Sequence, residues 1–246
     1  MSICTGGKLT ETSGVSEFRK QKLEHNAQKN WDRFYLRNST AFFKNRHWPR
    51  NEFEAKVLLE CGCGVGNLAF PLLEYFPELF VYACDFSPRA IQYVKVTISL
   101  LSFTIDLTRD ALSSSIPIAS VDVCTLVFVL SSIDPEKVNI VARNIWEARS
   151  VLKPAGSVFV RDYAQGDYAQ QRFGGHQKLE ENFYVRQDGT RSYFFTKEVL
   201  SKAFVNNGFR EASITYLHRE TVNRKDNISV PRLFIQAKFK KVALPV

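Results

Sequence analysis

A glycine-rich loop followed by an acidic residue is the part of the sequence best suited to chemistry. Gly62, Gly64 and Gly66 follow a short apolar run at 57–59, which indicates a strand that is buried on both faces. Glycine permits positive φ and lets a ligand approach the backbone closely. Asp85 ends the next apolar run, where a carboxylate can accept hydrogen bonds from both ribose hydroxyls of a nucleoside. The loop and the acid together predict a nucleotide-binding opening of a parallel sheet.

The spacing of the glycines separates this loop from a dinucleotide-binding one. The loop reads G-x-G-x-G, whereas the dinucleotide pattern is G-x-G-x-x-G and uses its third glycine for helix–strand packing. With Glu60 before it, the loop resembles the S-adenosylmethionine loop of Rossmann-like methyltransferases. The alternative is an ordinary strand-to-helix turn with an unrelated surface carboxylate at Asp85, and the combined features favour the cofactor loop.

Composition and length favour one α/β domain in a reducing compartment. The chain has 246 residues, of which 45% are hydrophobic and 24% charged, as in ordinary globular proteins. Its formal charge of +8 suggests an anionic partner. The five cysteines form no C-x-x-C pair and fall mostly in predicted strands, so we interpret them as small buried hydrophobes and expect no metal site.

The N-terminal stretch shows no targeting signal. Residues 1–16 lack the apolar core of a secretory signal, and we expect them to be disordered. No apolar run reaches membrane-spanning length, so we expect no membrane association. A cytoplasmic location, extending to the nucleus, is the expectation.

The order of apolar runs predicts a mostly parallel seven-stranded sheet, with an antiparallel C-terminal strand pair and helices on both faces. We expect no second domain, and residues 17–246 form the single domain. The expected strands are 57–59, 80–84, one within 96–106, a central one at 121–130, then 157–160, 212–222 and 228–240. The expected helices begin at Glu17, Asn67, Pro88, Pro135 and just after Thr196, and the helix from Pro135 is expected to reach Leu152. Residues 153–156 are predicted to form a turn, and Asp188-Gly189 predicts a hairpin with arms 183–186 and 190–195.

Cations alternate with aromatic residues in two stretches, 42–50 and 164–195. Aromatic rings stack on nucleobases and cations contact phosphates, so both stretches are candidate RNA-binding elements, together with the basic helix from Glu17. The candidates for stacking are Phe43, Tyr163 and Tyr184, and those for phosphates are Arg46, His47, Arg186 and Arg191. An aromatic cluster that plugs a domain edge is an equally good reading of 42–50.

Five longer stretches resemble one known family. They are NWDRFY at 30–35, FFKNRHW at 42–48, LECGCGVGN at 59–67, ACDFSPRAI at 83–91 and ENFYVRQDGTRSYFF at 181–195. The chain resembles the methyltransferase-like family that makes 3-methylcytidine in the anticodon loop of tRNA, over about 18–240. Within that family it looks closest to the cytosolic branch that acts on serine tRNAs. Compared with the family pattern, 53–57 and 95–106 are short, and 147–150 look like a small insertion.

The resemblance implies an S-adenosylmethionine-dependent enzyme that methylates N3 of cytidine at tRNA position 32. It implies the anticodon arm of tRNA as partner, with seryl-tRNA synthetase as a helper in the serine branch. Carried onto this sequence, the family pattern implies that the cofactor contacts Trp31, Tyr35, Gly62, Asp85, Asp106, Leu107 and Val127. Gly64 joins them as part of the loop.

The chemistry of the reaction suggests a role for Asp162. N3 of neutral cytosine carries a lone pair, so its attack needs no strong base, but the methylated ring is cationic and a carboxylate would stabilise the developing charge. Asp162 directly follows the fifth predicted strand and is our hypothesis for that carboxylate. The alternative is that Asp162 pairs with Arg161 or caps a turn.

Two other functions stay open at this point. A methyltransferase that acts on a small molecule or a protein would share the cofactor loop but would not need the cations at 42–50 and 172–193. A non-catalytic RNA-binding subunit could keep the fold with a defective cofactor pocket.

Overall fold

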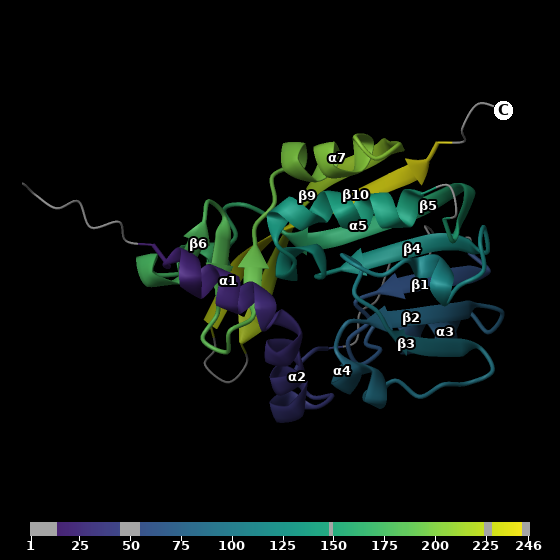
Figure 1. Cartoon of the computed structure of the whole chain (residues 1–246), viewed down its shortest axis with the longest axis horizontal. Coiled ribbons are helices and arrows are strands. Elements are labelled where there is room, and N and C mark those ends of the chain that lie inside the picture. Colours follow the sequence, from purple (N-terminus) through teal and green to yellow (C-terminus); the bar gives the residue numbers. More distant parts are fainter. Residues whose placement is uncertain (1–13, 45–54, 148–149, 224–227, 243–246) are drawn as a thin grey trace, which may run out of the picture.

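A seven-stranded sheet forms the centre of the molecule (Figure 1). The structure is a computed structural model and describes residues 14–44, 55–147, 150–223 and 228–242. The strand order is β3-β2-β1-β4-β5-β10-β9; the first five strands are parallel, and β10 is antiparallel to both β5 and β9. The predicted fold is confirmed, with the fourth strand at the centre. The strands are β1 (Val57–Cys61), β2 (Phe80–Asp85), β3 (Leu100–Thr104), β4 (Val121–Val127), β5 (Leu152–Tyr163), β9 (Phe209–Asn223) and β10 (Ile228–Lys241).

Helices cover both faces of this sheet (Figure 1). The α-helices of the described chain are α1 (Glu17–His25), α2 (Ala27–Asn38), α3 (Ala69–Tyr75), α4 (Pro88–Tyr93), α5 (Val138–Trp146), α6 (Tyr168–Gln171) and α7 (Lys197–Val205). Short 3-10 turns are η2 (Leu112–Ser114), η3 (Leu130–Ser132), η4 (Pro135–Lys137) and η5 (Gly175–Gln177). No helix in the described part of the chain is long and apolar enough to span a bilayer.

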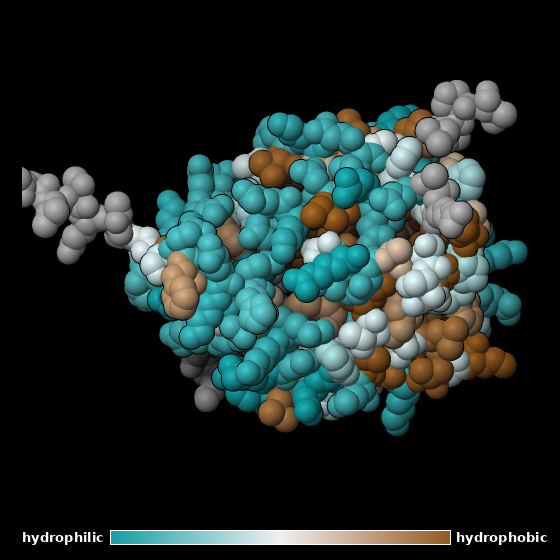
Figure 2. Space-filling view, viewed as in Figure 1, coloured by the Kyte–Doolittle hydropathy of each residue, from teal (hydrophilic) through white to brown (hydrophobic). Residues whose placement is uncertain are grey.

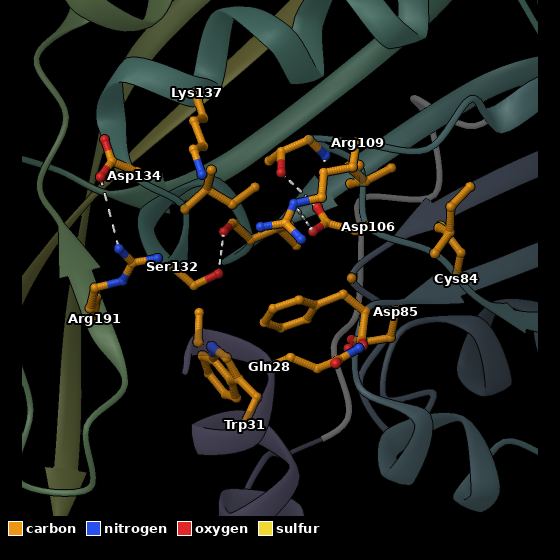
Figure 3. Close-up of a pocket in the computed structure, with 18 of the residues that line it drawn as sticks. Gln28, Trp31, Cys84, Asp85, Asp106, Arg109, Ser132, Asp134, Lys137 and Arg191 are labelled. Atoms are coloured by element: carbon orange, nitrogen blue, oxygen red, sulfur yellow. Dashed lines mark hydrogen bonds and ion pairs between the residues drawn. The ribbon is translucent and has the colours of Figure 1, made fainter. Parts of the chain in front are cut away.

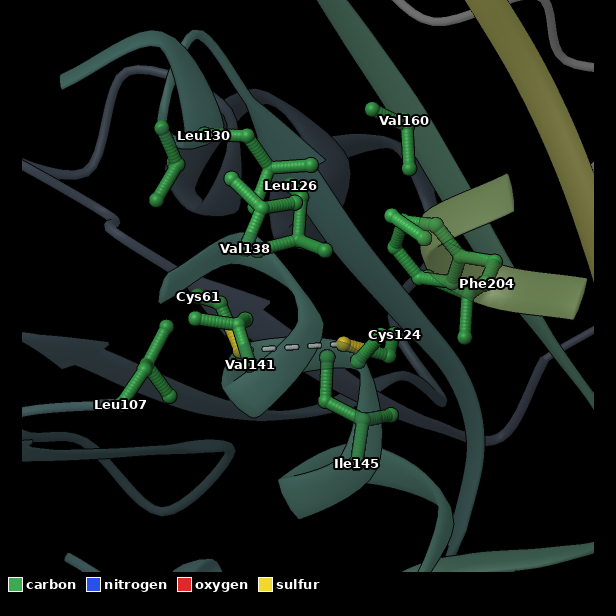
Figure 4. Close-up of a cluster of buried hydrophobic side chains, with 14 of the residues drawn as sticks. Cys61, Leu107, Cys124, Leu126, Leu130, Val138, Val141, Ile145, Val160 and Phe204 are labelled. Carbon is green, nitrogen blue, oxygen red and sulfur yellow. Dashed lines mark hydrogen bonds between the residues drawn. The ribbon is translucent and has the colours of Figure 1, made fainter. Parts of the chain in front are cut away.

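Alternation along the strands divides the core into two layers. Cys61 and Cys124 point to the layer that holds α5 and α7, and their sulfur atoms are 3.7 Å apart (Figure 4). Leu58 and Phe159 point to the opposite layer, where they pack with α3. Successive side chains of a strand face opposite sides, so strands buried on both faces read as continuous apolar runs.

The N-terminal region differs from the single helix that the sequence predicts. The helix is interrupted at Asn26, whose side-chain amide donates a hydrogen bond to the carbonyl of Lys22 at 2.8 Å. Such local bonds compete with the backbone bonds of a helix. Val15, within the stretch expected to be disordered, is buried, and its N–H donates to the carbonyl of Lys178. Residues 1–13 lie outside the described residues.

The connection into β5 also differs from the prediction. The helix that starts after Pro135 ends at Trp146, and Leu152 already belongs to β5. The predicted turn at 153–156 is present as an irregularity inside the strand, with Ala155 at a φ of 61°. The pairing of β5 with β4 shifts across it, because the additional residues have no partners on the opposite strand.

The segment 164–195 contains a small second sheet. The predicted hairpin is confirmed as β7 (Phe183–Val185) and β8 (Arg191–Tyr193), with Gly189 at a φ of 84° in its turn. A third strand, β6 (Lys178–Glu180), joins β7 and was too short to predict.

A buried ion pair attaches this segment to the main sheet. The Asp167 carboxylate is completely buried and accepts hydrogen bonds from the guanidinium of Arg232 at 2.8 and 3.0 Å. It also accepts a bond from the N–H of Leu233 at 2.7 Å. One carboxylate therefore fixes the start of α6 to β10.

We expect Asp167→Ala to lower the free energy of unfolding by about 3 kcal/mol, because it leaves the Arg232 guanidinium unpaired in a largely buried place. Urea unfolding followed by circular dichroism measures this. Lys20→Ala, which breaks a more exposed pair with Glu180, serves as control and should change the free energy of unfolding far less than Asp167→Ala does. Equal effects of the two substitutions would contradict the role of Asp167.

Candidate active site

A cavity of about 340 Å³ lies at the carboxyl ends of the central strands (Figure 3). Its wall is built from α2, the glycine loop after β1, the end of β2, residues 105–110, η3 and η4, and β8. In doubly wound sheets this edge is where ligands bind, because the loops after the strands open there. Trp31, Tyr35, Gly62, Asp85, Asp106 and Leu107, which the sequence proposed as cofactor contacts, all line this one cavity.

Asp85 holds two loops of the cavity together. Its two carboxylate oxygens accept hydrogen bonds from the N–H groups of Gly64 and Ser87, both at 2.9 Å. Burial raises the pKa of Asp85 to about 6, although these N–H groups act to lower it. Each carboxylate oxygen can accept more than one hydrogen bond, so Asp85 keeps acceptor capacity for a ligand hydroxyl.

The glycines of the loop make room for neighbouring side chains. Gly62 and Gly64 have φ values of 64° and 54°, in the region that side chains disfavour. A Cβ on Gly64 would lie 2.8 Å from the hydroxyl of Tyr35, and a Cβ on Gly62 would collide with Val129. The close approach of α2 to the loop therefore requires glycine at position 64.

Helix α2 is fixed against the turn after β2. Asp32 accepts a hydrogen bond from the Ser87 hydroxyl, and the Gln28 amide donates to the carbonyl of Phe86 at 2.6 Å. These bonds place Trp31 and Tyr35, one helical turn apart, on the cavity side of α2 (Figure 3 labels Trp31 and Gln28). Ser87 also caps α4, as the sequence predicts.

The connection before β3 is short, but the residues after β3 still reach the cavity. β3 pairs in parallel with β2 from Leu100 to Thr104, so Asp106 and Leu107 follow directly at the cavity. The Asp106 carboxylate accepts bonds from the N–H and the hydroxyl of Thr108, at 2.9 and 2.7 Å.

The side chain of Val127 does not line the cavity, which corrects one expectation. It packs in the opposite layer with Leu58 and Phe159, because it shares the strand face of Val123. The cavity wall is formed instead by Phe128 and Val129, after β4 has ended. The sequence placed the end of this strand at residue 130 and so gave no signal for Phe128.

Asp162 lies beneath the cavity wall, completely buried. Its carboxylate accepts hydrogen bonds from the N–H groups of Ser131 at 3.0 Å and Tyr163 at 2.9 Å. Burial raises its pKa to about 6. Asp162 therefore caps η3, as the turn-capping alternative stated, and it does not line the cavity; its role in stabilising the positive charge on the methylated base stays a prediction.

Most candidate RNA contacts in 164–195 have partners inside the protein. The Arg186 guanidinium donates to the carbonyl of Arg191 and to the Ser192 hydroxyl, both at 3.0 Å. The ring of Tyr184 stacks on Phe173 with centroids 4.8 Å apart.

Arg191, expected to contact phosphate at the surface, is instead buried. Only 5% of it is exposed, and its guanidinium forms an ion pair with Glu24 and lies 3.9 Å from Asp134 (Figure 3). Arg191 is therefore part of the cavity wall, where its charge is already compensated, and not a surface contact for phosphate.

Phe43 and Tyr163, two further candidates for stacking, both pack against other aromatic rings of the protein. Phe43 packs against Phe34 and Phe42, with centroids 5.6 and 4.9 Å away, which fits the domain-edge alternative. Tyr163 lies beside Phe128, with centroids 5.0 Å apart. Arg46 and His47 fall outside the described residues. Within the described part of the chain, no group of His, Cys, Asp or Glu could hold a metal ion.

Comparisons with known proteins agree with this geometry. Residues 59–158 match the family described as Methyltransferase domain. The tRNA N(3)-cytidine methyltransferase METTL6 of Rattus norvegicus is 54% identical over 92% of this chain and 84% of its own length. The tRNA N(3)-methylcytidine methyltransferase trm141 of Schizosaccharomyces pombe is 40% identical over 95% of this chain and 100% of its own length.

A solved structure shows the same fold at low sequence identity. A SAM-dependent methyltransferase from Methanosarcina mazei superposes with a TM-score of 0.60 and 16% identity, over 80% of this chain and 99% of its own.

The fold, the cavity and the relatives lead to one conclusion. The chain belongs to the S-adenosylmethionine-dependent tRNA N(3)-cytidine methyltransferases.

Proposed function

We propose that this enzyme methylates N3 of cytidine 32 in the anticodon loop of serine tRNAs, with its cofactor in the cavity described above. The observation that carries the proposal is the Asp85 carboxylate, held by the N–H groups of Gly64 and Ser87 at the opening of that cavity. The similarity to METTL6 supports the choice of serine tRNAs.

The residues present fit the cofactor. Asp85 would accept the ribose hydroxyls, and Asp106 and Leu107 would meet the adenine end, because they follow the next strand outward. Gly62 would let the backbone approach the methionine part, with Trp31 and Tyr35 covering it from α2, whereas Gly64 donates to Asp85 and leaves room for the Tyr35 hydroxyl.

The bound cofactor supplies an electrophilic methyl group on a sulfonium. The protein's task is to hold N3 in line with that group, since the lone pair of neutral cytosine attacks without a base. Positive charge then develops on the base. The buried Asp162 would favour that charge through its field and would keep the wall at Ser131 in place without touching the substrate.

A basic hollow between α1 and α2 supports tRNA binding by the N-terminal region. It is lined by four cations, Arg19, Lys22, Lys29 and Arg33, beside the exposed ring of Phe18. Hydrophilic side chains gather over α1 and the small sheet in Figure 2, whereas hydrophobic ones gather over the β2–β3 side. Phosphate contacts of this kind supply affinity without reading sequence.

The same proposal includes seryl-tRNA synthetase as a helper and the cytoplasm as location. The four described cysteines are free and buried, which fits a reducing compartment.

We expect the purified enzyme to transfer tritium from labelled S-adenosylmethionine to total tRNA and to yield 3-methylcytidine on nucleoside analysis. Purified serine tRNA should be the preferred substrate, and addition of seryl-tRNA synthetase should raise the rate. A tRNA with uridine at position 32 is the control and should accept no label. Labelling of other tRNAs with equal efficiency would reject the serine preference.

We expect cofactor affinity to fall as the pH drops through about 6, because the Asp85 carboxylate, with its pKa raised to about 6, accepts ribose hydroxyls most strongly when ionised. Isothermal titration calorimetry at pH 8 and pH 5.5 measures this. Asp85→Asn should bind more than tenfold more weakly than the wild type at pH 8 and should lose the pH dependence. The control Asp122→Asn changes a carboxylate at the amino ends of β1 and β4, far from the cavity, where it accepts bonds from the N–H groups of Lys56 and Val57.

We expect Asp162→Asn to lower kcat about tenfold with cofactor affinity unchanged, since the substitution removes the buried negative charge but lies outside the cavity lining. The wild-type kcat should decrease below pH 6 as Asp162 becomes protonated, and the variant should lack this decrease. Asp122→Asn again serves as control. A large loss of cofactor affinity in Asp162→Asn would show that Asp162 acts by folding the cofactor site.

A further inference from the structure

Phe128 adopts a backbone conformation that bulky residues avoid. Its φ is 59°, whereas the other described non-glycine residues with positive φ are serine, alanine or asparagine. Such a conformation costs free energy and persists only where the surroundings impose it, often at functional sites. Here the N–H of Phe128 donates to the carbonyl of Arg161 at 2.7 Å, so the neighbouring strand β5 holds the bend.

The bend ends β4 and brings Phe128 into the cavity wall. Behind it lies an aromatic cluster: the rings of Tyr163 and Phe234 have centroids 5.0 and 5.3 Å from the ring of Phe128. The guanidinium of Arg232, itself fixed by Asp167, lies 5.7 Å from the Tyr163 ring. The Phe128 ring is therefore supported from behind by a rigid group of side chains from β5 and β10.

The order of the strands indicates which part of the reaction takes place next to Phe128. Along the sheet, Asp106 follows β3, Asp85 follows β2, the glycine loop follows β1, and Phe128 follows β4. A cofactor with its nucleoside at the first two strands and its methionine part at the glycine loop presents its sulfonium toward β4. The methyl acceptor must then approach from the β4 side, where Phe128 lies.

We propose that Phe128 stacks on the target cytosine and holds its N3 in line with the methyl group. The proposal rests on the cofactor placement given under the proposed function. A base in an RNA loop can be splayed out and stacked on an aromatic side chain, and each such contact contributes substantially to binding. Because the backbone bend is held by β5, the ring offers a fixed plane for the base.

Phe128→Leu tests this, because leucine keeps the hydrophobic contact with Tyr163 but removes the plane. We expect kcat/KM for serine tRNA to fall about tenfold or more, while cofactor affinity and the thermal midpoint stay near wild type. Phe128→Tyr should restore the rate. Phe80→Leu, which removes a ring packed against Tyr82 at the start of β2 and outside the cavity lining, is the matched control and should leave kcat/KM unchanged.

A binding experiment separates stacking from the reaction itself. An anticodon stem-loop carrying fluorescent pyrrolocytosine at position 32 should lose fluorescence on binding to the wild type and to Phe128→Tyr, but much less on binding to Phe128→Leu. Equal quenching by wild type and Phe128→Leu, or an unchanged kcat/KM in that variant, would overturn the role of Phe128. Failure of the wild type to methylate position 32 would reject the proposed function instead, and the quenching comparison would still decide whether Phe128 stacks on the base.

Discussion

The cavity depends on one buried carboxylate, that of Asp85. Burying a charge is costly, and its raised pKa of about 6 reflects that cost. Hydrogen bonds from the N–H groups of Gly64 and Ser87 offset it and fix the loops after β1 and β2 in one arrangement. Through Ser87 and Asp32 the same network reaches α2 and places Trp31 over the cavity. A single desolvated group thus sets the geometry of three chain segments.

Asp162, in β5, has a similar arrangement on the other side of the central β1–β4 pair. It is the last but one residue of β5, as Asp85 is the last residue of β2; it is buried, has a pKa raised to about 6, and accepts bonds from two backbone N–H groups. One carboxylate arranges the proposed nucleoside side of the cavity and the other supports the wall next to Phe128. Carboxylates serve here because each can satisfy several backbone donors that loops after strands would otherwise leave unpaired.

The cations of the chain divide into structural and exposed groups. In the segment 164–195 and on β10, Arg191 pairs with Glu24, Arg232 pairs with Asp167, and Arg186 bonds within its hairpin. These interactions tie the small sheet to α1 and β10, and they use the positive charge internally. The cations along α1 and α2 instead line an open hollow.

The sequence by itself determined the sheet, because long apolar runs in order can form only a few topologies. It also predicted a cofactor site from Gly62, Gly64 and Asp85, of which Gly62 and Asp85 line the cavity. It also predicted that β3 would lie between residues 96 and 106. Only the tertiary structure decided which side chains reach the cavity. Val127, the last residue of β4, points away from the cavity. Phe128 lines the cavity because its backbone bends there, and a hydrogen bond to β5 holds the bend. Arg191 and Asp162 are buried by segments distant in sequence, and local patterns carry no information about such contacts.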